Sequence, residues 1–498
     1  MKRFFFLIIA VFFCPQIKAQ NLNDALRYGI ESTNGTARFN AMSGAFGALG
    51  GDLSAIGINP AGSAVFIDNF VGVSLSVLDT DNDTSYFNNR TSSAQTDLNF
   101  NQLGGVFVNH NDNPDSPWKK FSFGLNFENV KNHDDDLFLK GNGDNSIADF
   151  FVGQANGVQL NELKAGEYSY LGERFGTFAQ NAYLGYLGFI IDPLDAENPS
   201  NTQYVSNISG NRFNQEFSSV SKGYNSKYAI NFATQYTENL YLGINLNIHA
   251  IDYQRSNFLF ESNENEASIV DRVGFQNNLF VYGSGFSTQI GAIYKLNNIR
   301  LGLTYDTPTW YTISEETSQS LQSRRNIDGQ AITEIISPDI INIFPEYELR
   351  TPGKLNASGA LVLGTTGLLS FDYSYKDYGN TAFSPKNDPL FIVLNNNIEN
   401  SLQGASTYRL GGEYRLNNIS FRGGYRFEES PYNDTSKLGD LNGYSLGLGY
   451  KYRYYNFDIS YSRAEQSRKE QIPGLADNSF ANINSVYSNV VFTLGINL

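Results

Sequence analysis

The chain is poor in the residue types that build disulfide bonds and metal centres. Its 498 residues include one cysteine, Cys14, two tryptophans, two methionines and three histidines. The histidines His110, His133 and His249 do not have the spacing of metal ligands, and no nucleophile elbow of a serine hydrolase is present. We therefore expect no disulfide, no metal, no cofactor and no catalytic residue, and we predict that the protein is not an enzyme.

The sequence after Ala19 also lacks an apolar run long enough for a membrane-spanning helix. Before that point, Lys2 and Arg3 precede an apolar stretch at 4–13, which is typical of a secretory signal peptide covering residues 1–19. Cations are in the minority, since the formal net charge is −15. An acidic surface of this kind disfavours nucleic acid as a partner.

What the sequence has in quantity is alternation between apolar and polar residues. From Tyr408 to Arg453, three runs carry Tyr, Phe, Leu or Ile at every second position, with Gly, Arg, Ser or Glu between them. A period of two is typical of a β-strand, because successive side chains leave opposite faces. Runs of about ten residues with aromatic ends and a charged second face indicate a transmembrane β-barrel with a wet lumen. A large soluble β-protein is the alternative, because alternation alone does not distinguish lipid from a dry core.

The same pattern recurs in about fourteen segments between residues 67 and 498, an even number as in bacterial barrels. Tight turns such as Asn297-Asn298 and Asn417-Asn418 alternate with long connections, so we place the turns in the periplasm and the long connections outside the cell. The longest connection, 130–222, is expected to have structure of its own. We predict an all-β fold, an antiparallel barrel in the outer membrane of a Gram-negative cell with partly helical extracellular loops.

Residues 20–66 do not alternate and are rich in glycine and alanine. Small residues at this density let one backbone approach another closely, which suits a segment threaded inside a narrow space. The segment ends at Asn59-Pro60-Ala61-Gly62, and strands begin just after it.

This order of a signal peptide, a small-residue segment closing on Asn59-Pro60-Ala61-Gly62, and strands to the C-terminus resembles the FadL-type transporters of long-chain fatty acids and aromatic hydrocarbons. A second similarity is the sequence LRTPGKL at 349–355, which is followed by strands. The resemblance covers essentially the whole mature chain.

The resemblance implies that residues 20–66 form an N-terminal hatch inside the barrel and that its movement lets substrate pass. The residues that would join the hatch to the first strand and take part in gating are Asn59, Pro60, Ala61 and Gly62. The resemblance also suggests a lateral exit through a kinked third strand. Gly124 is the candidate residue there, because a glycine within a strand permits a bend or bulge.

The long connection 130–222 contains an aromatic stripe with three- and four-residue steps. Its members include Phe175, Phe178, Tyr183, Tyr186 and Leu187. This spacing predicts one face of an amphipathic helix. The stripe is a candidate surface for collecting apolar ligands outside the cell, and the alternative is that it packs against the rest of the connection.

Four charged residues fall on the polar faces of the predicted strands, namely Arg409, Glu413, Arg422 and Arg426. Inside a barrel they have three possible roles: they pair with one another, they hold the hatch, or they receive the carboxylate head group of a substrate. Pairing is the general expectation, because charges removed from water need partners.

Together these features predict a monomeric outer-membrane channel for the passive uptake of hydrophobic small molecules, fatty acids or aromatic hydrocarbons, through a hatch-gated lumen. Its partners would be the hydrophobic substrate and outer-membrane lipid. Two alternatives remain open at this point. One is a porin for polar solutes, and the other is a surface adhesin whose barrel displays the large external connection.

Overall fold

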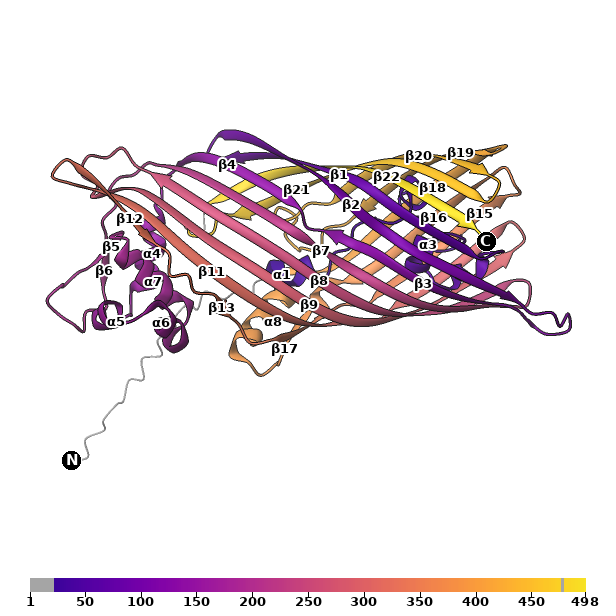
Figure 1. The fold of residues 1–498 in the computed structure, drawn as a ribbon, viewed down its shortest axis with the longest axis horizontal. Helices are drawn as coiled ribbons and strands as arrows, with labels where there is room; N and C mark the ends of the chain where they lie inside the picture. The colour runs from indigo at the N-terminus through magenta and orange to yellow at the C-terminus, as the bar shows by residue number, and fades with distance from the viewer. Residues whose placement is uncertain (1–21, 476–478) are drawn as a thin grey trace, which may run out of the picture.

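Fourteen long strands form a closed antiparallel barrel in the computed structural model, which describes residues 22–475 and 479–498 (Figure 1). The signal peptide predicted at 1–19 lies outside the described residues. In order around the barrel the strands are β1 (Phe70–Tyr86), β2 (Asn89–His110), β3 (Trp118–Asn132), β7 (Phe213–Tyr236), β8 (Leu240–Ser262), β9 (Val270–Leu296), β10 (Ile299–Asp306), β15 (Lys354–Leu363), β16 (Gly367–Asp377), β18 (Gly404–Leu416), β19 (Ile419–Glu428), β20 (Leu441–Tyr452), β21 (Tyr455–Gln471) and β22 (Phe480–Asn497).

The first and last strands close the barrel. β1 pairs with β22 from Phe70 opposite Asn497 to Ser85 opposite Asn482. Each other strand pairs antiparallel with its neighbour in the order above, so the described strands leave no free edge at this level of the wall. The predicted all-β barrel of about fourteen strands is confirmed.

Tight turns connect the strands at the end of the barrel that carries the C-terminus (Figure 1). Thr237, Asn297, Asn417 and Arg453 each adopt a left-handed backbone with φ between 54° and 55°. A positive φ is what a two-residue hairpin turn requires to match the twist of its strands. We assign this end to the periplasm, because outer-membrane barrels have their short turns there.

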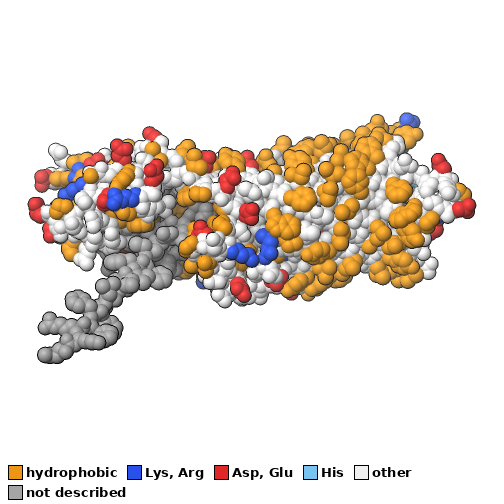
Figure 2. All heavy atoms as spheres, turned by 90° about the horizontal axis from the view of Figure 1, so that it is seen from below, with side chains coloured by type: hydrophobic (Ala, Val, Ile, Leu, Met, Phe, Trp, Pro, Cys, Tyr) orange, Lys and Arg blue, Asp and Glu red, His pale blue; other side chains and the backbone are white. Residues whose placement is uncertain are grey.

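The outer face of the barrel is apolar and its inner face is polar. Leu410, Tyr414 and Leu446 point outward and are more than half exposed, whereas Ser445 and Thr493 point inward and are buried. Figure 2 shows hydrophobic side chains gathered over the half of the barrel next to the short turns, with charged side chains at the other end. This band is the surface that contacts lipid in a transmembrane barrel.

Several strands continue well beyond this band. β7, β8 and β9 have 24, 23 and 27 residues. At about 3.3 Å per residue and a tilt of about 40°, 24 residues rise by roughly 60 Å, which is twice the hydrocarbon thickness of about 30 Å. The extra length forms a tall wall outside the membrane.

Further strands and several helices complete that outer wall. The strands are β4 (Asp135–Gly143), β11 (Thr309–Ile327), β12 (Gln330–Ile336), β13 (Asn342–Ile343), β14 (Tyr347–Thr351) and β17 (Ala382–Ser384), and the separate hairpin is β5 (Ile191–Pro193) with β6 (Tyr204–Ser206). The helices are α4 (Ile147–Ala155), α5 (Leu160–Ala165), α6 (Tyr168–Phe175), α7 (Thr177–Leu187), η2 (Tyr378–Asn380) and α8 (Pro389–Ser401). None of the helices within the described ranges has the length and hydropathy of a membrane-spanning helix.

The long external connection is narrower than the predicted 130–222. β3 runs to Asn132 and β7 already begins at Phe213, so the connection covers 133–212 and itself contains β4. The predicted limits were too wide because strands in the outer wall face water or the helices, where the outward residues need not be apolar.

Candidate functional site

The N-terminal segment lies inside the barrel. Its helices are α1 (Leu22–Arg27), α2 (Ala37–Ala41), α3 (Leu53–Ile58) and the 3-10 helix η1 (Pro60–Val65). α2 contacts β19 to β22, whereas η1 contacts β3, β7, β8 and β9, which lie on the other side of the barrel. The segment therefore crosses the lumen and forms a plug, defined here as residues 22–66.

Two side chains cap the N-termini of short helices in the plug. The Thr36 hydroxyl accepts a hydrogen bond from the amide of Phe39 at 3.1 Å, and a carboxylate oxygen of Asp52 accepts one from Ser54 at 2.9 Å. Each bond satisfies an amide that the first turn of a helix leaves without a partner. Helices of five or six residues are unstable alone, so the caps and the surrounding wall fix this shape together.

The junction between the plug and the first strand is buried in the periplasmic half of the lumen and is held there by hydrogen bonds. Asn59 is fully buried, and its amide group donates to the carbonyl oxygens of Gly47 at 2.8 Å and Ala292 at 3.1 Å. Asn231 of β7 donates to the carbonyl oxygen of Pro60 at 2.9 Å. The backbone of this junction approaches the wall closely because β9 has a glycine there: a Cβ on Gly291 would lie 2.1 Å from Asn59 Oδ1.

A network of buried charges connects the plug to β18, β19 and β21, on the side of the barrel opposite β7 and β9. The Arg38 guanidinium of α2 lies 2.8 Å from the carboxylate of Glu413, which also binds Arg422 at 2.7 Å and pairs with Arg415. Arg422 in turn reaches Asp458 at 2.5 Å. A second carboxylate of the wall, Asp372, accepts from two amides of the plug, Phe46 at 3.1 Å and Gly47 at 2.8 Å.

The four charged residues chosen from the sequence thus have different surroundings. Glu413 and Arg422 pair with each other, and Glu413 also binds Arg38 of the plug. Arg426 contacts the Thr33 hydroxyl of the plug and lies 3.3 Å from Glu428. Arg409 differs, because its Nε is buried and has no hydrogen-bond partner among the described residues.

An apolar region surrounds the first helix of the plug, toward the long-loop end of the lumen. We call it the upper apolar cluster, and it includes Leu26, Tyr28, Ile251, Leu279, Val281, Ile313, Leu349, Phe383, Phe391, Leu394 and Ile398. Helix α8 covers it from one side, and the first helix of the chain, α1, is packed into it. The guanidinium of Arg27 stacks 4.3 Å from the ring centroid of Tyr253, which fixes α1 in place.

A small charged cavity of about 60 Å³ adjoins this cluster. Its charged lining residues are Glu31, Glu428, Glu429, Lys354, Lys376 and Arg409, and Tyr378 lines it from the edge of the apolar cluster. The Glu31 carboxylate lies 2.7 Å from Nζ of Lys354 and 3.9 Å from Nζ of Lys376. Cationic groups and apolar side chains therefore share one part of the lumen.

Partial desolvation in the lumen raises the pKa of Glu31, but the ammonium groups of Lys354, Lys376 and Lys227 lower it by more. The pKa consequently lies well below the usual value of a glutamate. Glu31 is therefore ionised at neutral pH and presents a full negative charge to the two lysines.

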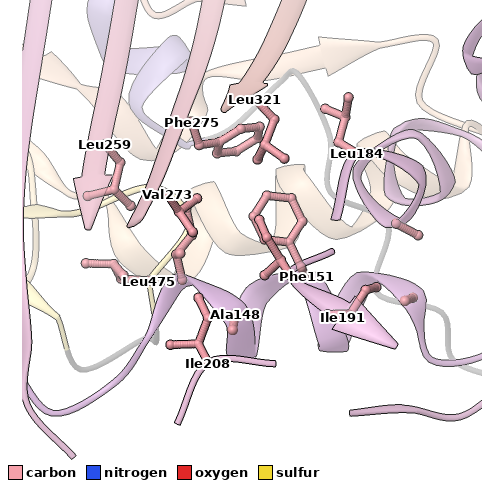
Figure 3. Close-up of a cluster of buried hydrophobic side chains, with 14 of the residues drawn as sticks. Ala148, Phe151, Leu184, Ile191, Ile208, Leu259, Val273, Phe275, Leu321 and Leu475 are labelled. Atoms are coloured by element: carbon pink, nitrogen blue, oxygen red, sulfur yellow. The ribbon is translucent and has the colours of Figure 1, made fainter. Parts of the chain in front are cut away.

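The external helices have a core of their own. Figure 3 shows Phe151 of α4 facing Phe275 and Leu321 of the outer wall, with Leu184 of α7 beside them. Among the predicted collecting residues, those that are partly buried and pack against this core are Phe175, Phe178, Tyr183 and Tyr186, while Leu187 is exposed.

The single helix predicted for the aromatic stripe is wrong. Gly176, with φ of 93°, separates α6 from α7, so Phe175 belongs to a different helix from the other four residues. A left-handed backbone ends an α-helix, and glycine adopts it without steric cost. The spacing of the aromatic residues did not reveal this break.

The third strand has an uninterrupted ladder at Gly124. β2 and β3 stay in register from Gln102 opposite Glu128 to His110 opposite Lys120, and the shifts between β3 and β7 fall near the two ends of β3. A hollow of about 450 Å³ lies at β2, β3 and β7, and its lining includes the half-exposed rings of Phe107 and Phe121.

Three residues of the site were not chosen from the sequence, namely Glu31, Arg38 and Lys354. Glu31 lies 323 positions from its partner Lys354, and Arg38 lies 375 positions from Glu413. One signal was available, since Glu31 is the sole acidic residue between Asp24 and Asp52. Within the described part of the chain, acidic, histidine and cysteine side chains do not gather as metal ligands would.

A closed barrel with an apolar exterior and a polar lumen, plugged by its own N-terminal segment, defines the class of plugged transmembrane β-barrels. Among solved structures, the chain is similar to a FadL homologue of Pseudomonas aeruginosa, with 12% identity, a TM-score of 0.55, and coverage of 94% of this chain and 99% of that chain. It is also similar to the toluene transporter TodX of Pseudomonas putida, with 13% identity, a TM-score of 0.52 and coverage of 94% and 99%. No protein-family model and no curated protein matches the sequence. The chain has the FadL-type fold, which confirms at the level of the fold the resemblance seen in the sequence.

Proposed function

We propose that this protein is an outer-membrane channel for the passive uptake of hydrophobic small molecules, long-chain fatty acids or aromatic hydrocarbons. The observation that carries the proposal is the upper apolar cluster, which has more buried residues than any other apolar cluster between the described plug and the barrel wall. A pore for polar solutes has no use for such a cluster, and it needs an open lumen where this chain has a plug. The FadL homologue and TodX support the same reading, since they share the fold and TodX is a toluene transporter.

Uptake in this proposal begins when an apolar ligand displaces α1 from the upper apolar cluster. Each large apolar side chain that α1 and the residue after it bury contributes about 1.5–3 kcal/mol, so Leu26 of α1 and the adjacent Tyr28 together contribute roughly 5 kcal/mol. A ligand with twelve or more methylene groups gains on the order of 10 kcal/mol at about 0.8 kcal/mol per methylene. A long acyl chain can therefore replace the helix.

The plug is the proposed gate, and the turn Asn59, Pro60, Ala61 and Gly62 is its fixed hinge at the periplasmic end. Movement of the segment before this turn would open the lumen, while the hydrogen bonds of Asn59 keep the segment attached. Lateral exit beside β3 is the proposed route into the membrane, and the hollow at β2, β3 and β7 supports it.

The experiment is uptake of radiolabelled oleate and toluene by cells with and without the protein. Expression should raise the uptake of at least one of these compounds, and a variant lacking residues 22–33, which include α1, should bind apolar ligand more tightly because nothing must be displaced. Identical uptake with and without the whole protein would refute the proposal.

A further inference from the structure

The cavity beside the upper apolar cluster already contains a carboxylate, and that carboxylate belongs to the plug. Glu31 reaches Lys354 of β15 at 2.7 Å, and Lys376 of β16 lies 3.9 Å from its other oxygen. The Glu31 side chain is 47% exposed, so solutes in the lumen can reach it. An ion pair of this kind can exchange partners, unlike one sealed in a core.

The same wall holds the residues on either side of Glu31. Lys376 donates to the carbonyl oxygen of Gly29 at 2.8 Å, and Arg426 contacts the Thr33 hydroxyl. Residues 29–33 are thus attached to β15, β16 and β19 by three cationic side chains. In the sequence, residues 29–33 connect α1, which fills the apolar cluster, to the remainder of the plug.

Two features of the cavity fit the head group of an amphiphile. Lys354, Lys376 and Arg409 supply cationic donors, and the Nε of Arg409 has no partner among the described residues. Ile30, Tyr378 and Leu438 line the cavity and also border the upper apolar cluster. A ligand that places its tail in the cluster brings its head to these cations.

Taking the proposed function as its basis, we infer that Glu31 is an internal stand-in for the carboxylate of an acidic amphiphile such as a long-chain fatty acid. The ligand carboxylate replaces that of Glu31 at Lys354 and Lys376, and this exchange frees residues 29–33 from the wall. Lys354 keeps Asp306 as a second partner at 3.2 Å, so the site does not lose its shape during the exchange. A neutral hydrocarbon fills the cluster without making this exchange.

The test measures binding of oleate and of oleyl alcohol, which has the same tail without the charge, to the full-length protein in detergent. Glu31→Gln should tighten oleate binding about tenfold, because the competing carboxylate is gone and the free site is more populated. Binding of oleyl alcohol should stay within about twofold. The matched control is Glu128→Gln, which removes another lumenal glutamate that pairs with a lysine, Lys227, at 3.2 Å but does not line the cavity.

A second readout follows the segment itself. Cys14 is the only cysteine of the sequence, so Ser32→Cys in a Cys14→Ser background carries one spin label next to Glu31. Oleate should raise the mobility of this label, and oleyl alcohol should not. Heat-modifiability on gels confirms that each variant is folded.

The inference is overturned if Glu31→Gln changes the affinity for the acid and the alcohol equally, if Glu128→Gln has the same effect as Glu31→Gln, or if oleate leaves the label immobile. In these cases apolar compounds still bind and the proposed function stands. If oleate, oleyl alcohol and toluene all fail to bind and to cross, the proposed function itself fails.

Discussion

At the scale of single residues, Glu413 shows how the lumen stabilises charge. Its side chain is 1% exposed and is surrounded by Arg38, Arg415 and Arg422. Removing one partner from a buried network leaves the others without compensation, which costs more than the network contributes when intact. Glu413→Gln should therefore lower the free energy of unfolding by about 3 kcal/mol, measured by guanidinium chloride titration in detergent micelles.

The matched control for that variant is Glu465→Gln. Glu465 pairs with Arg463 at 3.0 Å, but its side chain is 62% exposed. Exposed ion pairs contribute little, because water and salt screen them. An equal loss of stability in the two variants would show that burial of Glu413 is not the reason for its effect.

Gly291 is the residue on which the close approach of the plug to β9 depends. Because a Cβ there would lie 2.1 Å from Asn59 Oδ1, Gly291→Ala should push the junction away from the wall and loosen the plug. We expect more frequent open events in single-channel recordings from planar bilayers. Gly359→Ala of β15 is the control, since a Cβ at Gly359 has no atom within 4 Å, and equal conductance of the two variants would contradict this role.

At the scale of elements, β3 is where the proposed lateral route can be tested. Phe107 and Phe123 are paired across β2 and β3, and both line the hollow there. A disulfide between Phe107→Cys and Phe123→Cys should reduce uptake of labelled oleate several-fold, and a reducing agent should restore it. Facing residues of antiparallel strands are close enough for such a bond, since their Cα atoms lie about 4.5–5.5 Å apart.

The control for the cross-link is the pair Tyr414→Cys and Phe421→Cys. These residues are also partners across neighbouring strands, β18 and β19, but they lie far from β3 around the barrel. This disulfide should leave uptake unchanged. If both disulfides or neither of them reduce uptake, ligand does not leave beside β3.

The elements also show what the sequence can predict. All fourteen barrel strands of the described chain were predictable, because lipid on one side and a wet lumen on the other impose the period of two on each strand separately. The outer wall was less predictable, since strand ends such as 213–222 of β7 face water and helices. The break at Gly176 was missed because helical spacing continues across it and only the backbone angle changes.

The site was less predictable than the fold for a related reason. The polar faces of strands identified Glu413 and Arg422 as lumenal, but Arg38, the plug residue that Glu413 binds, comes from a segment with no periodic pattern. Glu31 and Lys354 meet only because the barrel is closed around the plug. Local pattern fixes which face a residue occupies, whereas pairing across the lumen depends on the tertiary structure.

At the scale of the whole molecule, the lumen has two zones that differ in the polarity of the side chains lining them. The lower zone is lined by polar side chains such as Asn231, Asn245 and Gln289, which bond to the plug backbone. The upper zone is apolar and holds α1. The plug thus accepts hydrogen bonds from the polar wall and covers the apolar wall. An apolar ligand needs to compete only with α1, the first helix of the plug.

This division predicts different outcomes for two deletions. Barrels of eight strands are filled by side chains and those of sixteen hold an aqueous channel, so a barrel of fourteen strands without its plug should conduct polar solutes. Deleting residues 22–66 should make liposomes swell in a pentose solution, whereas deleting only 22–33 should not, because α2, α3 and η1 still fill the lower zone. The barrel should still fold without the plug, because water can hydrate the polar wall, and heat-modifiability on gels checks this. Swelling with the intact protein would mean that the plug leaves a water path. That result would favour a porin for polar solutes over a channel for hydrophobic compounds.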